Sequence, residues 1–304
     1  MSTIGLVLEG DARHALVAAL SKAGYEVEVA ASPDRLEALV ARNGIDAWIF
    51  DARSDGVLEM LLPTGCYLLP ADNIPESSDR QEVADWAASL LIQLDLALTI
   101  SSKATPAGGA SRWGEVRAVW LIAGSAGATS AVQEFFDGFD EPPPVAFIYA
   151  QHLDPGQQHQ LESFTLGNPS FSLTLAEGAQ VLEPGRIVMV SPQRKVVLNK
   201  FGHIAGIRSD WAAAHTPDIN ELLIILTAAR LPSPGVIVFS GMGDDGAEAL
   251  PVFDAGGGVI WAQSPDSAIA AGMPQAAIDT GLVERTGDPQ ALARALTNLY
   301  RGSF

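Results

Sequence analysis

Three residues of types used in acyl transfer each follow a separate apolar segment of the chain. Ser125 comes after residues 118–122, His152 after residues 145–150, and Asp245 after residues 235–239. A serine hydroxyl needs an adjacent base to act as a nucleophile, and an imidazole oriented by a carboxylate can be that base. If the apolar segments are parallel strands of one sheet, the three side chains meet at its carboxyl edge. The pattern predicts a serine esterase.

Glycine-rich loops surround two of these candidates. Gly124 and Gly127 flank Ser125 and allow a tight turn from a strand into a helix, whose first N–H groups would face a developing oxyanion. The loop at residues 241–246 (GMGDDG) contains three glycines and could direct further backbone N–H groups toward the same oxygen. An oxyanion hole between the two loops is therefore expected.

Each candidate also has a structural interpretation. Ser125 could cap a helix that begins near Thr129, and Asp245 could cap one that begins near Ala247. His215 is a second candidate base. A phosphate-binding turn at Ser125 is disfavoured, because the loop lacks a Gly-x-Gly start and no Lys-Ser or Lys-Thr follows it.

The elements that would position these residues indicate two α/β domains. Strands are predicted at residues 4–8, 25–29 and 47–50, with helices between them, and this βαβαβ order implies a parallel sheet. Residues 99–114 are rich in Ser, Gly, Ala and Pro, which is typical of a linker. We therefore predict a smaller βα domain at residues 1–100, a linker at 101–114, and a doubly wound parallel-sheet domain at 115–304.

Within the second domain, helices are predicted at residues 129–136, 219–229 and 289–299 and from about residue 247. Residues 171–207 are rich in valine and turn residues, which predicts short antiparallel strands. Residues 258–262 are predicted to form the last strand.

Composition excludes several classes of function. The net charge of −18 disfavours nucleic-acid binding, and no apolar stretch is long enough to span a membrane. The first residues lack a basic region followed by an apolar segment, so the protein is predicted to be cytoplasmic. Cys66 is the single cysteine, and no histidine pair has metal-ligand spacing on a predicted helix. We expect no metal and no cofactor.

Residues 118–304 resemble the catalytic domain of CheB, the family of chemotaxis receptor methylesterases. Ser, His and Asp follow one another in that order, which differs from the Ser, Asp, His order of α/β-hydrolases. The resemblance implies Ser125 as nucleophile, His152 as base and Asp245 as its orienter. It also implies an oxyanion and substrate site at Ala126, Met242 and Gly243. The matching segments are residues 122–129 (IAGSAGAT), 151–152, 178–190 (GAQVLEPGRIVMV), 215–222 (HTPDINEL), 241–247 (GMGDDGA), 262–263 and 272–274.

By this resemblance the protein would hydrolyse glutamate γ-methyl esters on the cytoplasmic domain of chemoreceptors, and it could also deamidate receptor glutamines. A methylated receptor and a histidine kinase are the implied partners. The family pattern after the serine is Thr-Gly-Gly, whereas this chain has Ala126, Gly127 and Ala128. That difference motivates the alternative hypothesis of a catalytically weak or inactive adaptor that binds receptor or signalling partners.

The first domain resembles the receiver domain that normally precedes the catalytic domain in this family. Asp51, at the end of the third predicted strand, matches the phosphoacceptor position, although a structural acid at a strand end is the competing interpretation. A receiver needs a pair of acids after its first strand to bind Mg²⁺, and this chain has Glu9, Gly10 and Asp11 there. We interpret the domain as a degenerate, shortened receiver.

Overall fold

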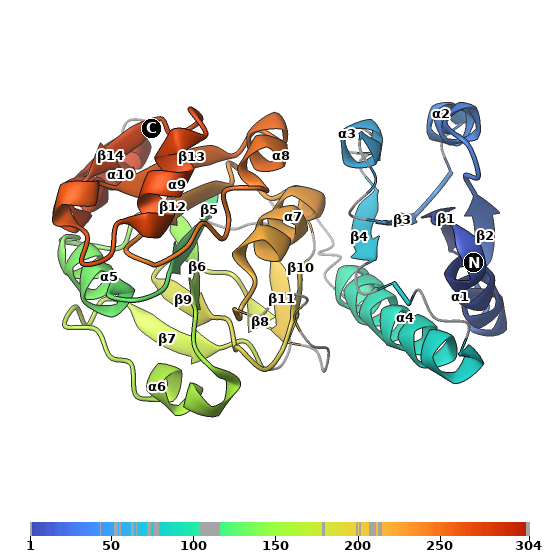
Figure 1. Cartoon of the computed structure of the whole chain (residues 1–304), viewed down its shortest axis with the longest axis horizontal. Helices are drawn as coiled ribbons and strands as arrows, with labels where there is room; N and C mark the ends of the chain where they lie inside the picture. Colours follow the sequence, from blue (N-terminus) through green and yellow to red (C-terminus); the bar gives the residue numbers. More distant parts are fainter. Residues whose placement is uncertain are drawn as a thin grey trace. The chain divides into compact units, whose positions relative to one another are not determined.

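The computed structural model describes most of the chain, and Figure 1 shows its elements. By their contacts the residues divide into two compact units, Met1–Thr105 with Ala228–Arg230 and Pro106–Thr227 with Leu231–Phe304. The described residues are 2–42, 44–51, 54, 56–61, 64, 66–71, 74–75, 79–103, 116–177, 180–198, 200, 202–206, 211 and 215–301.

The first unit is a four-stranded parallel sheet with helices between its strands. The strand order is β2-β1-β3-β4, which matches the first four strands of the flavodoxin-like order 2-1-3-4-5. The predicted βαβαβ arrangement is confirmed. The elements are β1 (Thr3–Val7), α1 (Gly10–Lys22), β2 (Glu26–Val29), α2 (Pro33–Arg42), β3 (Ala47–Asp51), α3 (Val57–Leu61), β4 (Tyr67–Ala71) and α4 (Arg80–Lys103).

Helix α4 extends into the predicted linker. Its N-terminus is capped by Asp79, whose carboxylate accepts the N–H of Gln81 at 2.8 Å. Ala87, Leu90 and Leu94 follow one another at helical spacing and are buried in the first core, which stabilises the helix against the sheet. Residues 101–103 therefore belong to α4, and residues 104–114 of the predicted linker lie outside the described residues.

The second unit is a seven-stranded, wholly parallel sheet in the order β14-β13-β12-β5-β6-β9-β7. The chain begins in the central strand β5, adds β6 on one side, and later adds β12 on the other, so the sheet is doubly wound as predicted. Its elements are β5 (Ala118–Gly124), α5 (Ala128–Asp137), β6 (Val145–Gln151), α6 (His159–Glu162), β7 (Ser172–Leu175), β9 (Arg186–Met189), α7 (Ile219–Ala229), β12 (Gly235–Val238), α8 (Leu250–Ala255), β13 (Val259–Gln263), α9 (Gly272–Asp279), β14 (Arg285–Gly287) and α10 (Pro289–Arg301).

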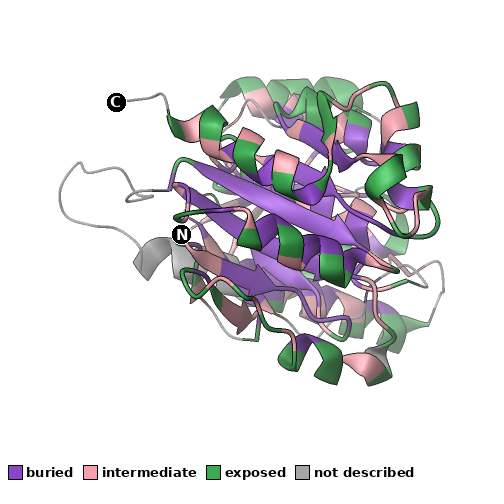
Figure 2. Ribbon diagram, turned by 90° about the vertical axis from the view of Figure 1, so that its left-hand side faces the viewer, coloured by how far each residue is buried: buried purple, intermediate pink, exposed green. Residues whose placement is uncertain are grey.

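Burial of both faces explains the continuous apolar sequence of the central strands. Every residue of β5 and β6 is buried, and Figure 2 shows the strands as a buried layer between helices with exposed outer sides. On one face, Phe135 of α5 and Leu296 of α10 pack on Trp120 and Phe147 in one apolar core. This core fixes the start of α5 directly above the end of β5.

The prediction for residues 171–207 was partly wrong. Strands β7 and β9 join the main sheet in parallel, while β8 (Gln180–Val181), β10 (Val196–Leu198) and β11 (His203–Gly206) form a separate antiparallel sheet. Because β7 lies at the edge of the main sheet, its residues are mostly half-buried and resemble an antiparallel strand in sequence.

Two further boundaries differ from the prediction. The last strand is β14, a short polar edge strand that has no apolar segment to reveal it. Helix α8 begins at Leu250, later than residue 247. Among the described residues, no helix is long and apolar enough to cross a membrane.

Candidate functional site

Ser125 and His152 lie side by side just beyond the paired ends of β5 and β6. Gly124 pairs with Gln151 as the last residues of the two strands, and the His152 N–H donates to the Gly124 carbonyl at 3.0 Å. The Ser125 N–H donates to the carbonyl of Ser240, just after β12, at 2.9 Å. Strand β6 lies on one side of β5 and β12 on the other, so Ser125 follows the strand at which the strand order reverses. Open parallel sheets usually have their sites at this position.

Asp245 completes the group. Its Oδ2 lies 2.7 Å from Nε2 of His152, and both side chains are largely buried, with 8% of the imidazole and 16% of the carboxylate exposed. In the serine protease triad the carboxylate binds Nδ1 and the serine faces Nε2. In His152 the carboxylate lies at Nε2 instead, so Nδ1 is the ring nitrogen that Asp245 does not occupy.

No hydrogen bond joins the Ser125 hydroxyl to the imidazole in the described part of the chain. Catalytic hydrogen bonds are often long without substrate and shorten only in the productive complex. The structure therefore brings all three sequence-predicted residues to one edge of the sheet, with the His152–Asp245 contact formed.

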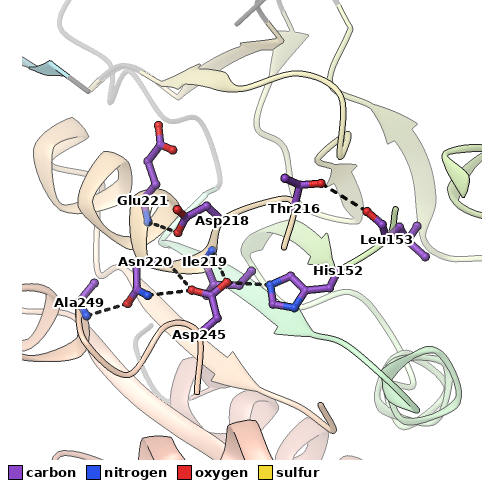
Figure 3. Close-up of polar contacts among 9 residues, drawn as sticks. All are labelled: His152, Leu153, Thr216, Asp218, Ile219, Asn220, Glu221, Asp245 and Ala249. Carbon is purple, nitrogen blue, oxygen red and sulfur yellow. Dashed lines mark hydrogen bonds and ion pairs between the residues drawn. The ribbon is translucent and has the colours of Figure 1, made fainter. Parts of the chain in front are cut away.

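The N-terminus of α7 holds the Asp245 carboxylate, as Figure 3 shows. The N–H of Ile219 donates to Oδ2 at 2.9 Å, and Asn220 donates to Oδ1 from its N–H at 3.2 Å and from Nδ2 at 2.8 Å. Burial alone would raise the pKa of Asp245, but the hydrogen bonds from His152 and from these backbone groups hold the pKa below its usual value. The carboxylate stays ionised beside the imidazole.

Asp245 therefore does cap a helix, but the helix is α7. The expected cap on a helix from Ala247 is wrong, because residues 247–249 form a turn and α8 starts later. Asn220 connects this turn to the site, since its Oδ1 accepts the N–H of Ala249 at 2.9 Å. The Asn220 side chain thus hydrogen-bonds both to the Asp245 carboxylate and to the backbone of Ala249 in the following turn.

The side chain of Asp218 caps the start of α7 itself. Oδ1 of Asp218 accepts the N–H of Glu221 at 2.9 Å, and Glu221 pairs with the buried Lys195 at 2.8 Å. Burial, with help from the charges of Asp245 and Glu221, raises the pKa of Asp218 to about 6. Asp218 and Glu221 flank Ile219 and Asn220, the two residues that donate hydrogen bonds to Asp245.

The turn after Ser125 depends on Gly127. This residue has φ 79°, and a Cβ there would lie 2.7 Å from Cβ of Ile269, so a side chain would be both strained and blocked. Gly127 is also the residue that precedes α5, and the helix has no side-chain cap. The alternative that Ser125 caps α5 is therefore wrong, and its hydroxyl is left for other chemistry.

The predicted oxyanion residues lie in the loops around Ser125. A Cβ on Gly241 would lie 3.0 Å from Cβ of Ser125, so the loop with Met242 and Gly243 passes directly by the candidate nucleophile. In the described part of the chain, the N–H groups of Ala126 and Met242 donate no hydrogen bond. Free donors of this kind are what an oxyanion hole requires.

Ser240 ties the surrounding loops together. Its hydroxyl donates to the carbonyl of Ala126 at 2.8 Å and accepts the N–H of Ala270 at 2.9 Å. Gln151 contributes in the same way, because its Nε2 donates to the Ser125 carbonyl at 3.1 Å. Sequence inspection missed these supporting residues, since a serine and a glutamine at strand ends carry no distinctive pattern.

Asn220 was missed for a different reason. Asp218, a residue type that commonly caps helices, does mark the start of a helix in the sequence. That mark predicts where α7 begins, but it says nothing about which carboxylate the helix will meet.

The two alanines that replace the family pattern have different positions. Ala128 is fully buried in the core of the second unit. Its methyl packs against Gly124, where an added Cβ would lie only 2.4 Å from it. Ala126 is exposed next to Ser125. The added methyl therefore fills the core under β5 and does not obstruct the substrate side.

His215, the second candidate base, lies against His152. Their rings stack with centroids 5.7 Å apart and an interplanar angle of 26°. The adjacent Thr216 carbonyl accepts the N–H of Leu153 at 2.9 Å, which holds the two segments together. His215 is exposed and stacks on the imidazole face, while Asp245 binds the ring edge of His152.

Asp51 belongs to the first unit, at the carboxyl end of β3. It lies with Glu9 in the wall of a cavity of about 440 Å³ at that edge of the first sheet. Asp11 lies in the first turn of α1. The described residues include no group of three or more His, Cys, Asp or Glu side chains that could hold a metal ion. Phosphorylation of Asp51 stays a prediction.

Comparison with known proteins matches residues 120–296 to a family model described as CheB methylesterase. A protein from Myxococcus xanthus (strain DK1622), named protein-glutamate methylesterase/protein-glutamine glutaminase 1, is 27% identical over 191 residues, covering 62% of this chain and 55% of the relative. A protein of the same name from Oleidesulfovibrio alaskensis is 29% identical over 186 residues, covering 60% of this chain and 50% of the relative. This chain thus spans about half the length of these relatives.

A third relative, protein-glutamate methylesterase/protein-glutamine glutaminase 3 of M. xanthus, is 24% identical over 286 residues, which cover 91% of this chain and 74% of the relative. The crystal structure of the Thermotoga maritima CheB methylesterase catalytic domain covers 60% of this chain and 97% of that domain, with a TM-score of 0.51 and 19% identity. That structure has the same fold. These matches confirm the resemblance inferred from the motifs, whereas the receiver-like assignment of residues 1–100 stays a prediction.

The raised pKa of Asp218 predicts a pH-dependent stability. Between about pH 4 and pH 6 the unfolded chain releases this proton while the folded chain keeps it, so the free energy of unfolding falls as the pH rises. Asp218→Asn keeps a good helix cap but cannot ionise. We expect the variant to gain about 2–3 kcal/mol relative to wild type between pH 4 and pH 7, measured by denaturant unfolding.

The exposed Gln160 supplies the control, because Gln160→Ala removes no ionisable group. The stability difference between Gln160→Ala and wild type should stay nearly constant over the same pH range. A constant difference for Asp218→Asn as well would contradict the raised pKa.

Proposed function

Because the chain belongs to the CheB methylesterase family, we propose that it hydrolyses γ-methyl esters of glutamate residues in proteins, with Ser125 as the nucleophile. The observation that carries this proposal is the buried His152–Asp245 contact beside Ser125, at the switch point of the parallel sheet. A serine, a base and an orienting carboxylate at one strand edge are the parts that acyl transfer requires.

The proposed reaction proceeds in two steps. Oγ of Ser125 attacks the ester carbonyl carbon while Nδ1 of His152 takes the hydroxyl proton, and the N–H groups of Ala126 and Met242 bind the resulting oxyanion. The carbon–oxygen bond to the methoxy group then breaks, and methanol leaves with the proton from His152. Water, deprotonated by the same imidazole, hydrolyses the acyl-enzyme and yields the glutamate carboxylate.

Asp245 supports both steps by stabilising the imidazolium that forms. It is ionised and buried, and its four hydrogen bonds fix the position of the negative charge. The same acyl-enzyme would form from a glutamine side chain, with ammonia as the leaving group. We therefore include glutamine deamidation, the glutaminase activity for which the relatives are also named, as a second proposed reaction of this site.

The proposed substrate is the methylated cytoplasmic domain of a chemoreceptor, within a chemotaxis-like pathway in the cytoplasm. Family membership supports this assignment, since the relatives are named for protein glutamate as the group they act on. A histidine kinase is proposed as a second partner on the same ground. Binding without turnover is the rival hypothesis. Of the two alanines that motivate it, Ala128 is buried, which favours turnover over the rival.

Methanol release from methylated receptor cytoplasmic domains tests the proposal. Ser125→Ala and His152→Ala should each lose about three orders of magnitude or more in kcat/KM, because each removes a member of the proposed triad. Ser172→Ala and His159→Ala, which change exposed residues outside the described contacts of the site, should retain wild-type rates. Wild-type activity no higher than that of Ser125→Ala would favour the adaptor.

Asn220 is proposed as a positioning residue for Asp245. Asn220→Ala removes the 2.8 Å hydrogen bond to Oδ1 of Asp245 and the hydrogen bond from the Ala249 N–H. The Asp245 carboxylate is then held less firmly in position to bind the imidazole. We expect kcat to fall by about tenfold to a hundredfold, with KM little changed. The pH profile of kcat should also shift, because the carboxylate proposed to orient the base would change position.

Comparing Asn220→Asp with Asn220→Ala separates the effect of an added charge from the effect of losing the Asn220 contacts. Asn220→Asp keeps the size of the side chain but places a second carboxylate next to Asp245, so it should shift the pH profile upward through the extra negative charge. An unchanged pH profile in both variants, with reduced stability alone, would show that Asn220 serves the fold and not the site.

A further inference from the structure

Two exposed apolar side chains lie next to the candidate nucleophile. Ile269 is 76% exposed and Met242 is 72% exposed, and they are the most exposed large apolar side chains in the described part of the chain. Scattered exposed apolar residues are normal on protein surfaces. These two, however, both belong to loops in contact with the Ser125 turn.

The contacts that place them are close. Ile269 packs against the backbone of Gly127, and Met242 follows Gly241, which passes next to Ser125. Hydrogen bonds join the loops, because Gly241 donates its N–H to the Ala270 carbonyl at 2.9 Å. Both apolar side chains are therefore presented by a fixed backbone, which lowers the entropic cost of binding a partner there.

The charge of the surrounding loops is one-sided. Residues 118–185 and 231–284, which carry Ser125, His152 and Asp245, contain no Lys or Arg. Asp154 and Asp244 are exposed in the loops that follow His152 and precede Asp245. A neutral ester meets no repulsion from this arrangement, whereas a free glutamate carboxylate finds no cation within these two segments and is repelled by both acids.

We propose that Met242 and Ile269 dock an apolar side chain of the protein segment that carries the ester, and that the cation-free loops make this docking selective for the ester over its carboxylate product. The inference rests on the proposed function for the position of the ester at Ser125. It adds a substrate requirement, an apolar residue near the esterified glutamate, and a reason for release of the product.

Synthetic peptides test the docking contact. One set carries a single glutamate γ-methyl ester in an alanine and serine background, with one leucine placed in turn at each position from four before to four after the ester. At least one placement should lower KM by about tenfold relative to the peptide without leucine, because burying part of an apolar side chain has roughly that effect on affinity. Equal KM values across the set would overturn the proposal.

Variants locate the contact. Ile269→Ser should abolish the gain from leucine, while Leu299→Ser, which removes an exposed apolar side chain on α10, should preserve it. Loss of the gain in both variants, or in neither, would contradict docking at Ile269. Circular dichroism and turnover of the leucine-free ester peptide show whether the variants are folded.

Product inhibition tests the charge. The carboxylate peptide should inhibit wild type weakly, and Ile269→Lys, which places a cation beside Ser125, should strengthen that inhibition by about threefold to tenfold at low salt. The effect should shrink as salt is added. Equal inhibition of Ile269→Lys and wild type at low salt would overturn the selectivity part of the proposal.

Binding to Ser125→Ala separates this inference from the proposed function. If wild type hydrolyses no peptide, yet Ser125→Ala binds the leucine peptides in an Ile269-dependent way, the esterase assignment fails and the docking contact stands. If hydrolysis depends on Ser125 but neither rate nor binding depends on the leucine, the esterase assignment stands and the docking contact is wrong.

Discussion

The site depends on a single buried carboxylate, Asp245, and on the donors that compensate for its burial. An ionised carboxylate is costly to bury unless hydrogen bonds and opposite partial charges surround it. The N-terminus of α7 supplies both, through the N–H groups of Ile219 and Asn220 and through the positive end of the helix dipole. Because the carboxylate is fixed by the backbone of a helix, the His152 imidazole that binds it is fixed as well.

This constraint extends through the second unit. Helix α7 must begin at one place, and the Asp218 cap and the buried Lys195–Glu221 pair hold that start. The loop after β12 must bring Asp245 to it, and Asn220 ties the loop to the helix. Ser125 needs no contact with α7, because β5 and β6 already place it beside His152 through their parallel register. The nucleophile and the acid are thus positioned by different parts of the fold.

The exposed side of the site differs from its buried side in how far its charged and apolar groups have partners. On the buried side, hydrogen bonds compensate the charge of Asp245, and Lys195 pairs with Glu221. On the exposed side, Met242 and Ile269 remain without cover and the neighbouring acids have no basic residue in the same segments. Such a surface suits a neutral group flanked by apolar side chains, and it is poorly suited to retain an anion.

Patterns in the sequence were sufficient for the parallel sheet and for Ser125, His152 and Asp245 as candidates. Parallel strands buried on both faces must be apolar throughout, and polar residues directly after such strands stand out. The patterns failed at β7 and β14, because edge strands are only half-buried and lack that signal. They also failed at the end of α4, where Ser-rich and Thr-rich helix resembles a linker.

By itself, then, the sequence determined which residues could do chemistry and which fold would bring them to one edge. Only the tertiary structure decided how they are held: that Asp245 caps α7 and not the helix after it, that Asn220 and Ser240 join the loops, and that Ala128 faces the core. The physical reason is the range of the interactions. Burial and helical or strand periodicity act on neighbouring residues and leave a pattern in the chain, whereas a hydrogen bond between residues 25 positions apart leaves none.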